Sequence, residues 1–305
     1  RWSPHRLTVV LPCLEYARQD RRMVAGEAIP PKLLLRCLKT AGANRFLTVD
    51  LHNQAAAGFS PAGTVLDELT AEQYIAHFVR TNVPNFDETR VAVCATSGGG
   101  IKFTRRMANV LRVGFMMTDR FGIKDGGTNE TKIVADPDTE QHDIEGVVIV
   151  DDMFDTCGNL ARVCQALHAL LPRAKLYGVA PHGYFSDTAH EQVGKLVDAY
   201  SLEWVAVTNS VEQTGAVERF RHVGVGDRLR VIDISRLLAG AILRLHSGSN
   251  VNLPKFRSLG PDVQDPVLDK APLVPTYQYT HVAPGDGPEG AKRRAQLQRR
   301  PTPWE

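Results

Sequence analysis

The feature that most constrains the fold is a series of short apolar segments spread along the chain. Each has the length of a β-strand, and most lack the alternation of polar and apolar residues that marks a strand with one solvated face. We therefore predict strands that are buried on both faces. These are Leu7–Pro12, Phe46–Asp50, Arg90–Cys94, Val113–Met117, Val147–Asp151, Lys175–Ala180, Trp204–Thr208 and Leu229–Ile234.

Helical patterns separate several of these strands. After Val147–Asp151, apolar residues recur at intervals of three and four, which predicts one apolar helix face over residues 158–171. The residues of this face are Leu160, Val163, Cys164, Leu167, Leu170 and Leu171. A repeated order of strand, helix and strand indicates an α/β fold with a parallel sheet.

The C-terminal part differs in composition. The alternation ends near His246–Asn252, and nine of the 18 prolines lie within residues 254–305, which also contain the basic cluster KRRAQLQRR. We expect a flexible or wrapped extension there rather than a further domain.

The overall composition is that of a globular protein, with 43% hydrophobic and 23% charged residues in a chain of 305. A formal net charge of +2 gives no electrostatic reason to expect nucleic acid or a membrane surface as a partner. No segment approaches the roughly 20 apolar residues of a membrane helix, and the first residues lack the apolar core of a signal peptide. The five cysteines are odd in number and contain no C-x-x-C, which favours reduced thiols. We therefore expect a cytoplasmic protein.

The segment VVIVDDMFDTCGN, residues 147–159, carries the strongest chemical signal. Its turn, Thr156–Asn159, leads into the predicted helix, so that backbone N–H groups and the helix dipole can hold a phosphate. Asp151 and Asp152 instead suit the hydroxyl groups of a sugar, or Mg²⁺, and a sugar phosphate offers both kinds of group. The structural alternative is a buried strand followed by a helix cap at Asp155 or Thr156.

Two more polar segments follow predicted strands, where ligands bind in open α/β sheets. In TSGGGIK, residues 96–102, three glycines let the backbone approach a ligand, and a plain tight turn is the alternative. In DLHNQ, residues 50–54, Asp50 and His52 can serve a metal-bound phosphate, although a histidine beside an acid is more often structural.

A third segment, EYARQDRR at residues 15–22, follows the first predicted strand. Its arginines can clamp phosphates, while Gln19 and Asp20 can read the polar edge of a base. A solvated charged loop is the alternative. Separately, the polar stretch from Asp119 to Glu145 joins two predicted strands, and its length predicts a mobile flap over a site.

Taken together and in this order, these segments resemble ribose-phosphate pyrophosphokinase, also called phosphoribosyl pyrophosphate synthetase. YARQD, DLH followed by GF, the Gly-rich turn, VVIVDDMFDTCGN, HGYFS, VTNS and VIDIS each have a similar string in that family, and the match runs from about Leu7 to Asn252.

The resemblance implies an α/β fold with two similar phosphoribosyltransferase-type domains, whose parallel sheets are flanked by helices. It implies that residues 1–80 are the remainder of the N-terminal pyrophosphokinase domain and that 81–235 form the C-terminal domain of phosphoribosyltransferase type. It further implies that 236–252 form a helix returning to the N-terminal domain and that 253–305 are a Pro-rich, basic and flexible extension. The family has a strand and helix ahead of the matched region, and we expect that segment to be missing here.

The resemblance also implies a reaction, in which the diphosphoryl group of MgATP passes to ribose 5-phosphate to give phosphoribosyl pyrophosphate and AMP. ATP, ribose 5-phosphate and Mg²⁺ would be the ligands, and the assembly would be a homo-oligomer or a hetero-oligomer with family members. Carried over by position, ribose 5-phosphate would meet Asp151, Asp152, Asp155, Thr156, Cys157, Gly158 and Asn159. ATP would meet Arg18, Gln19, Asp20 and His52, with His52 also at the metal. The diphosphate loop would be Ser97, Gly98, Gly99, Gly100 and Lys102.

The chain departs from the family in its diphosphoryl-binding parts. The Gly-rich turn of the family carries an Asp where this chain has Ser97 and an Arg where it has Phe103. The family's flexible loop carries a K-x-R pair, which aligns with Arg120 and Gly122, and we take Arg120 and Lys124 as the catalytic candidates.

Three functions stay open at this stage. The first is an active pyrophosphokinase. The second is a non-catalytic regulatory subunit that assembles with active family members, which the loss of the acid at Ser97 favours. The third is a phosphoribosyltransferase, against which YARQD and DLH argue because that class need not bind ATP.

Overall fold

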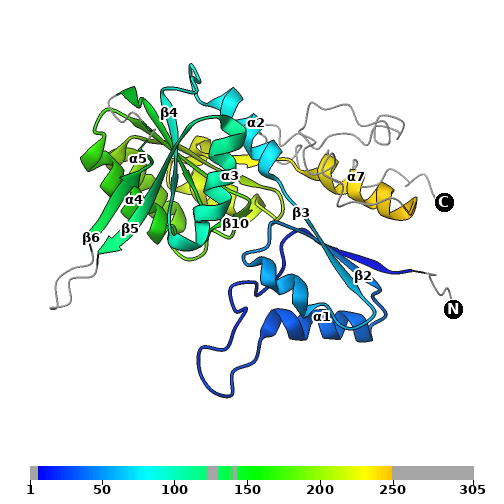
Figure 1. Cartoon of the computed structure of the whole chain (residues 1–305). Coiled ribbons are helices and arrows are strands. Elements are labelled where there is room, and N and C mark those ends of the chain that lie inside the picture. Colours follow the sequence, from blue (N-terminus) through cyan, green and yellow to red (C-terminus); the bar gives the residue numbers. More distant parts are fainter. Residues whose placement is uncertain (1–5, 122–129, 138, 140–142, 249–305) are drawn as a thin grey trace, which may run out of the picture. The chain divides into compact units, whose positions relative to one another are not determined.

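The computed structural model describes residues 6–121, 130–137, 139 and 143–248. It has the predicted α/β fold, in which parallel strands dominate two main sheets flanked by helices, and β8 and β10 form a further two-stranded sheet (Figure 1). The strands are β1 Thr8–Leu11, β2 Arg45–Val49, β3 Val65–Leu69, β4 Val91–Ala95, β5 Gly114–Phe121, β6 Glu130–Ala135, β7 Gly146–Val150, β8 Met153–Phe154, β9 Lys175–Ala180, β10 His182–Gly183, β11 Leu202–Thr208 and β12 Leu229–Ile232. The α-helices are α1 Pro30–Thr40, α2 Glu72–Asn82, α3 Ile101–Leu111, α4 Gly158–Leu170, α5 Ala189–Tyr200, α6 Thr214–His222 and α7 Ser235–His246. The 3-10 helices include η1 Gln54–Phe59 and η2 Gly98–Gly100.

The larger sheet has the strand order β12-β11-β9-β7-β4-β5-β6. All neighbouring pairs are parallel except β5 and β6, which are antiparallel. In the central strand β7, Val148 and Val150 pack into one hydrophobic cluster, while Val147 and Ile149 pack into another on the opposite face. This burial on both faces explains why the segment reads as a continuous apolar run.

Helices cover both faces of this sheet (Figure 1). Residues of α2, α3 and α7 share a cluster with Val148 and Val150, and residues of α4, α5 and α6 share a cluster with Val147 and Ile149. The predicted helix at 158–171 corresponds to α4, and its residues Leu160, Val163, Cys164 and Leu167 are buried as the periodicity predicted. Leu170, at the last turn, is exposed, and its assignment to the buried face is wrong.

The smaller sheet has the order β1-β2-β3, and all its strands are parallel. Leu35 of α1 and Phe46 of β2 are buried in a separate cluster that also contains Leu14 and Ala56. Strand β3 was not predicted, because its sequence VLDEL carries two acids. Asp67 is buried in β3 and forms an ion pair with Arg45 of β2, with Nε and Oδ2 3.1 Å apart.

The stretch from Asp119 to Glu145 is in part regular structure, and the prediction that it forms a mobile flap stays a prediction. Strand β5 continues to Phe121, and β6 pairs with it, with Asp119 opposite Lys132. Residues 122–129 lie outside the described part of the chain.

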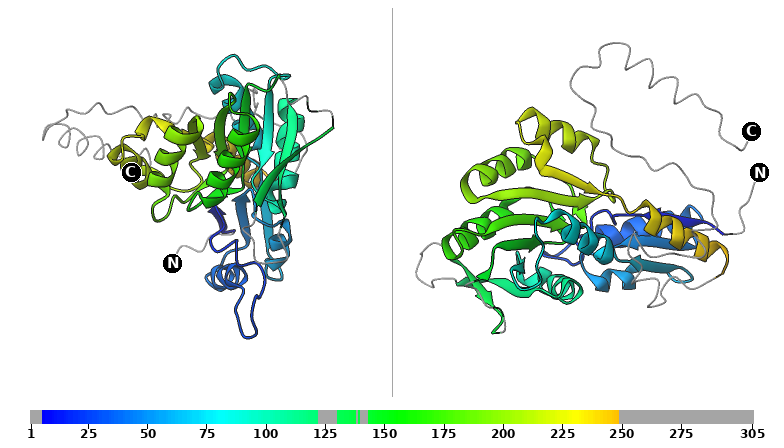
Figure 2. Two further views of the ribbon diagram at one scale, coloured as in Figure 1. Left: turned by 90° about the vertical axis from the view of Figure 1, so that its left-hand side faces the viewer. Right: turned by 90° about the horizontal axis from the view of Figure 1, so that it is seen from above.

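Helix α7, orange in Figure 2, contacts the beginning of the described chain: Nη2 of Arg6 donates to the carbonyl of Leu245 at 2.6 Å. The predicted extension at 253–305 lies outside the described residues, and the predicted domain boundaries stay predictions. All five cysteines are unpaired thiols, as expected. None of the helices in the described ranges is long and apolar enough to span a membrane.

Candidate functional site

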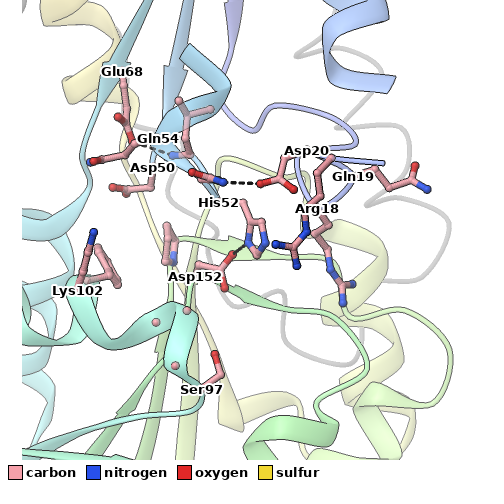
Figure 3. Close-up of a pocket in the computed structure, with 18 of the residues that line it drawn as sticks. Arg18, Gln19, Asp20, Asp50, His52, Gln54, Glu68, Ser97, Lys102 and Asp152 are labelled. Carbon is pink, nitrogen blue, oxygen red and sulfur yellow. Dashed lines mark hydrogen bonds and ion pairs between the residues drawn. The ribbon is translucent and has the colours of Figure 1, made fainter. Parts of the chain in front are cut away.

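A pocket of about 740 Å³ lies at the carboxyl ends of strands from both sheets. It brings together three segments that are distant in sequence: the loop after β1, the loop after β2, and the Gly-rich turn after β4 (Figure 3). Asp152, which follows β7, joins them. The predicted residues that line the pocket are Arg18, Gln19, Asp20, Arg21, Asp50, His52, Ser97, Gly98, Gly99, Gly100, Lys102 and Asp152.

The turn before α4 leaves its backbone N–H groups without a side-chain cap. Cys157 is the N-cap residue, and no side-chain hydrogen bond caps the helix, so the alternative of a cap at Asp155 or Thr156 is wrong. The backbone of Cys157 is left-handed, with φ of 61°, and its side chain is 4% exposed. Cys157 therefore has only its backbone to offer a ligand, and burial raises the pKa of its thiol to about 12.

Asp151 and Asp152 lie in different environments although they are adjacent. Asp151 is 5% exposed, and burial, together with the charge of Asp152, raises its pKa to about 7. Burial also acts to raise the pKa of Asp152, but the hydrogen bond and charge of His52 outweigh it and the pKa is lowered. At neutral pH, Asp152 is therefore the carboxylate that presents a full negative charge to the pocket.

The Gly-rich turn lies against Asp151. A Cβ atom at Gly100 would lie 3.9 Å from Oδ1 of Asp151 and 4.0 Å from Oγ of Ser97. A turn without side chains at Gly98, Gly99 and Gly100 thus brings its backbone close to the acids after β7.

His52 and Asp152 form the most direct link between the two sides of the pocket. Nδ1 of His52 lies 2.5 Å from Oδ2 of Asp152, and the two side chains point toward one another in Figure 3. This hydrogen bond, reinforced by the charges of Asp152 and Asp20, raises the pKa of His52 against the opposing effect of burial. The histidine is thereby favoured in its charged form.

The loop after β1 makes a second link. Nη1 of Arg18 lies 2.6 Å from Oδ2 of Asp155, a residue of the predicted ribose-phosphate segment 137 positions away. Asp20 accepts a hydrogen bond from Nδ2 of Asn53 at 2.5 Å, which ties this loop to the loop that carries His52. Gln19 lies farther out, with its amide directed away from His52 (Figure 3).

Asp50 lines the pocket and also makes a structural contact, and its role toward a metal-bound phosphate stays a prediction. Its side chain is 7% exposed, and Oδ2 accepts the backbone N–H of Ala71 at 2.9 Å, just before α2. Burial raises its pKa to about 6.

The remaining ribose-side residues lie outside the pocket lining. Asp151, Asp155, Thr156, Gly158 and Asn159 all belong to the segment after β7, and the pocket touches that segment at Asp152. Asn159 accepts a hydrogen bond from Nη2 of Arg162, one helical turn further along α4. Of the catalytic candidates, the backbone of Arg120 lies in β5 and Lys124 lies outside the described residues, so their roles stay predictions.

One pocket residue that sequence reasoning missed is Arg106 of α3. Its Nε donates to Oε2 of Glu72 at 2.8 Å, and its guanidinium lies 5.4 Å from the centre of the Phe103 ring. Arg106 is three positions after Phe103, which stands where the family has Arg, so it lies on the same side of the helix. The three-residue spacing from Phe103 is the sequence signal that could have identified Arg106.

Glu68 was also missed, although it lines the pocket. Its Oε1 accepts the backbone N–H of Leu51 at 2.9 Å, which holds the loop before His52. No sequence signal could reveal it, because the strand that carries it was itself not predicted.

The residues fit Mg²⁺ only as part of a complex with a substrate. Within the described ranges, no group of three or more His, Cys, Asp or Glu side chains is placed to hold a metal ion. Mg²⁺ is usually bound by one or two carboxylates together with substrate phosphates and water. Asp20 and Asp152 line one pocket and suit an ion that arrives on the phosphates of a nucleotide, whereas the predicted role of His52 at the metal requires its neutral form.

Three family models match successive parts of the chain. The N-terminal domain of ribose phosphate pyrophosphokinase matches residues 1–42, the phosphoribosyl transferase domain matches 62–183, and the phosphoribosyl synthetase-associated domain matches 135–255.

Solved structures are similar as well. Phosphoribosylpyrophosphate synthetase from Mycobacterium smegmatis is 25% identical, with a TM-score of 0.64, over 81% of this chain and 74% of that chain. Adenine phosphoribosyltransferase from Saccharomyces cerevisiae is 18% identical, with a TM-score of 0.31, over 47% of this chain and 77% of that chain. The assignment rests on the first of these and on the family models.

The larger sheet and its match define an α/β protein with a phosphoribosyltransferase-type domain. More narrowly, the chain belongs to the ribose-phosphate pyrophosphokinase family, as its sequence motifs predicted.

Proposed function

We propose that this chain transfers the β,γ-diphosphoryl group of MgATP to O1 of ribose 5-phosphate, giving phosphoribosyl pyrophosphate and AMP. The observation that carries the proposal is the common pocket. The charged loops after β1 and β2, the Gly-rich turn and Asp152 after β7 all line it, so residues expected to bind the nucleotide meet a residue expected to bind the sugar in one cavity. The 5-phosphate of the sugar would lie beyond this lining, at the start of α4.

In this proposal different groups of the ribose-side segment bind the hydroxyl groups and the phosphate of the sugar. Asp152 accepts hydrogen bonds from ribose hydroxyls, and the backbone N–H groups at Gly158 and Asn159 hold the 5-phosphate at the start of α4. Asp155 completes this side, and Cys157 acts through its backbone because its side chain is buried.

On the nucleotide side, Arg18 and His52 supply positive charge, while Gln19 and Asp20 lie beside them in the same lining. Lys102 and Arg106 of α3 face the same cavity and would stabilise charge on the transferring phosphates. Arg120 and Lys124 stay candidates for the same role. Mg²⁺ carried on the phosphates would neutralise negative charge during transfer.

The transfer itself needs no covalent enzyme intermediate. The O1 oxygen of the sugar bonds to the β-phosphorus, the bond between that phosphorus and the α,β-bridging oxygen breaks, and AMP leaves with the electron pair. The O1 proton is released. Binding and orientation of the two substrates is therefore the main contribution of the chain.

The experiment is an incubation of the purified protein with MgATP and ribose 5-phosphate, followed by separation of the nucleotides. Formation of AMP that requires ribose 5-phosphate supports the proposal. Absence of AMP under conditions where both ligands bind would reject it.

A second candidate function is a non-catalytic regulatory subunit. The observation that favours it is the altered diphosphoryl side, where Ser97 replaces an acid and Phe103 replaces an arginine of the family pattern. In that case the protein would form no AMP and would co-purify with an active family member. We also propose an oligomeric, cytoplasmic protein, and light scattering of the purified chain would measure its oligomeric state.

A further inference from the structure

The segment HGYFS, residues 182–186, has no role in the site described above. It begins in β10, which pairs in parallel with β8, the short strand between Asp152 and Asp155. Tyr184 and Phe185 both donate their backbone N–H groups to the carbonyl of Phe154, at 2.8 and 3.2 Å. The segment is thus fixed along the ribose-side acids by its main chain.

Only the first two residues of the segment are extended strand, and Phe185 has a left-handed backbone with φ of 46°. Gly183 and Phe185 face the core: Phe185 is fully buried, and a Cβ atom at Gly183 would lie 2.7 Å from its ring and 2.8 Å from Val207. The side chains of His182, Tyr184 and Ser186 instead hydrogen-bond to other segments of the chain. We call these three residues the HGYFS strip.

His182 reaches the loop that carries His52. Its ring is 2% exposed, and Nε2 lies 2.9 Å from the carbonyl oxygen of Asp50. Because a carbonyl only accepts, Nε2 carries the proton and donates. Nδ1 lies 2.8 Å from Oγ of Ser210, which fixes the ring from its other edge.

The other two members of the strip make equivalent links. The hydroxyl of Tyr184 lies 3.0 Å from Sγ of Cys13, in the loop before Arg18. Ser186 donates to Oδ1 of Asp155, whose Oδ2 holds Arg18. Each side chain of the strip therefore contacts a segment that carries a predicted ligand-binding residue.

These contacts close a loop of interactions. The carbonyl of Asp50 accepts a hydrogen bond from His182, whose backbone nitrogen lies 3.4 Å from the carbonyl oxygen of Asp152. The side chain of Asp152 is in turn hydrogen-bonded to His52, which is two residues after Asp50. A buried, fully bonded side chain in such a loop fixes the positions of its neighbours.

We propose that His182, Tyr184 and Ser186 are positioning residues that set the nucleotide-side loops against the ribose-side acids, so that binding of one substrate strengthens binding of the other. This rests on the proposed function for the identity of the two ligands. Coupled sites of this kind change each other's affinity by roughly 5- to 150-fold.

The test compares four variants. His182→Leu removes both ring hydrogen bonds, and His182→Gln keeps an N–H at a similar reach. Ser186→Ala removes one hydroxyl and covers the case in which His182→Leu does not fold. His190→Leu of α5 is the matched control, because Nδ1 of His190 is buried without a hydrogen-bond partner in the described part of the chain.

For each variant, calorimetry measures the Kd of ribose 5-phosphate with and without a saturating α,β-methylene analogue of ATP, in which the scissile bond is blocked. Hydrogen exchange of residues 50–57 is measured without ligands. We expect about tenfold coupling in the wild type and in His190→Leu, coupling near onefold in His182→Leu, and reduced coupling in Ser186→Ala. His182→Gln should recover part of the coupling that His182→Leu loses. Among the variants, only His182→Leu should show faster hydrogen exchange at residues 50–57 than the wild type.

The proposal would be overturned if His182→Leu and Ser186→Ala showed the same coupling between the two ligands as the wild type. It would also be overturned if the wild type showed no coupling. Equal loss in His182→Gln and His182→Leu would also overturn it, because the hydrogen bond to Asp50 would then not be its basis. Coupling without any AMP formation would leave the proposal standing while rejecting the proposed reaction. If neither ligand binds, the hydrogen-exchange rate of residues 50–57 decides. A wild-type rate in His182→Leu would reject the positioning role of the strip, and a faster rate would support it.

Discussion

Nδ1 of His52 lies 2.5 Å from Oδ2 of Asp152, although the two residues are 100 positions apart in the chain. His52 belongs to a loop with predicted nucleotide contacts, and Asp152 to a segment with predicted sugar contacts. A ribose hydroxyl that reaches Asp152 must therefore share or displace the hydrogen bond from His52. The pair is the point at which the two halves of the pocket meet.

Asp152→Asn tests the sugar-binding role of this acid. Loss of a charge-assisted hydrogen bond is expected to weaken ribose 5-phosphate binding about 10- to 100-fold in calorimetry. The pair is partly exposed, so the free energy of unfolding should change by about 1 kcal/mol or less.

The same variant should lower the pKa of His52, because the hydrogen bond that His52 donates to Asp152 is the largest cause of its elevation. Titration of the histidine by NMR measures this. The control is Asp198→Asn on the exposed side of α5, which should change neither quantity. Equal sugar binding in the wild type and Asp152→Asn would refute the assignment.

The raised pKa of Asp50 predicts a specific pH dependence of the free energy of unfolding. Its pKa is raised from 3.8 to about 6, so between these values the folded state holds a proton that the unfolded chain has released. Its contribution to stability is present below about pH 4 and is lost as pH rises through about 6, a change on the order of 3 kcal/mol.

Asp50→Asn removes the titrating group and keeps an oxygen that can accept the N–H of Ala71. Denaturant unfolding at pH 4 and pH 7 measures the difference. We expect the variant to gain stability relative to the wild type at pH 7 and not at pH 4. A difference between the two proteins that is the same at both pH values would contradict the buried, protonated state of Asp50.

Arg18→Ala tests the nucleotide side. The ion pair with Asp155 is largely exposed, so its loss should change the free energy of unfolding by less than about 1 kcal/mol. Binding of the methylene analogue of ATP should weaken by about tenfold, because a phosphate-binding cation is removed. Arg22→Ala is the control, since Arg22 is exposed and does not line the pocket. If both substitutions weakened binding of the analogue equally, the effect would come from the net charge of the loop and not from a specific contact of Arg18.

Ser97→Asp tests whether the altered Gly-rich turn limits activity. A carboxylate at this position would add a ligand for the metal that accompanies the nucleotide. We expect roughly tenfold faster AMP formation and a lower Mg²⁺ requirement, with Ser97→Asn as the uncharged control. Identical rates in all three proteins would show that the turn is not the limiting part.

The alternation of apolar runs and helical faces was enough to predict six of the seven strands of the larger sheet. Val147–Val150 is apolar at every position because it is covered on both sides, and this burial can be read from sequence. Strand β3 could not be predicted, because Asp67 is buried against Arg45, a partner that only the folded chain supplies. Strand β6 was missed because its sequence ETKIVA lies at the edge of the sheet and is partly polar.

The segments of the site could be named from sequence, but not their contacts. Arg18 and Asp155 are 137 positions apart, and nothing in either segment indicates the other. His182 is a further example, since its role depends on the carbonyl of Asp50, which has no sequence signature. Positions could thus be predicted from motifs, whereas pairings required the fold.

The most direct test of the central claim follows labelled phosphate. The protein is incubated with ribose 5-phosphate and MgATP labelled at the γ-phosphate, and the products are separated. We predict that the label enters phosphoribosyl pyrophosphate in an amount equal to the AMP formed. Label that remains in ATP, or appears as inorganic phosphate without phosphoribosyl pyrophosphate, would contradict the proposed diphosphoryl transfer.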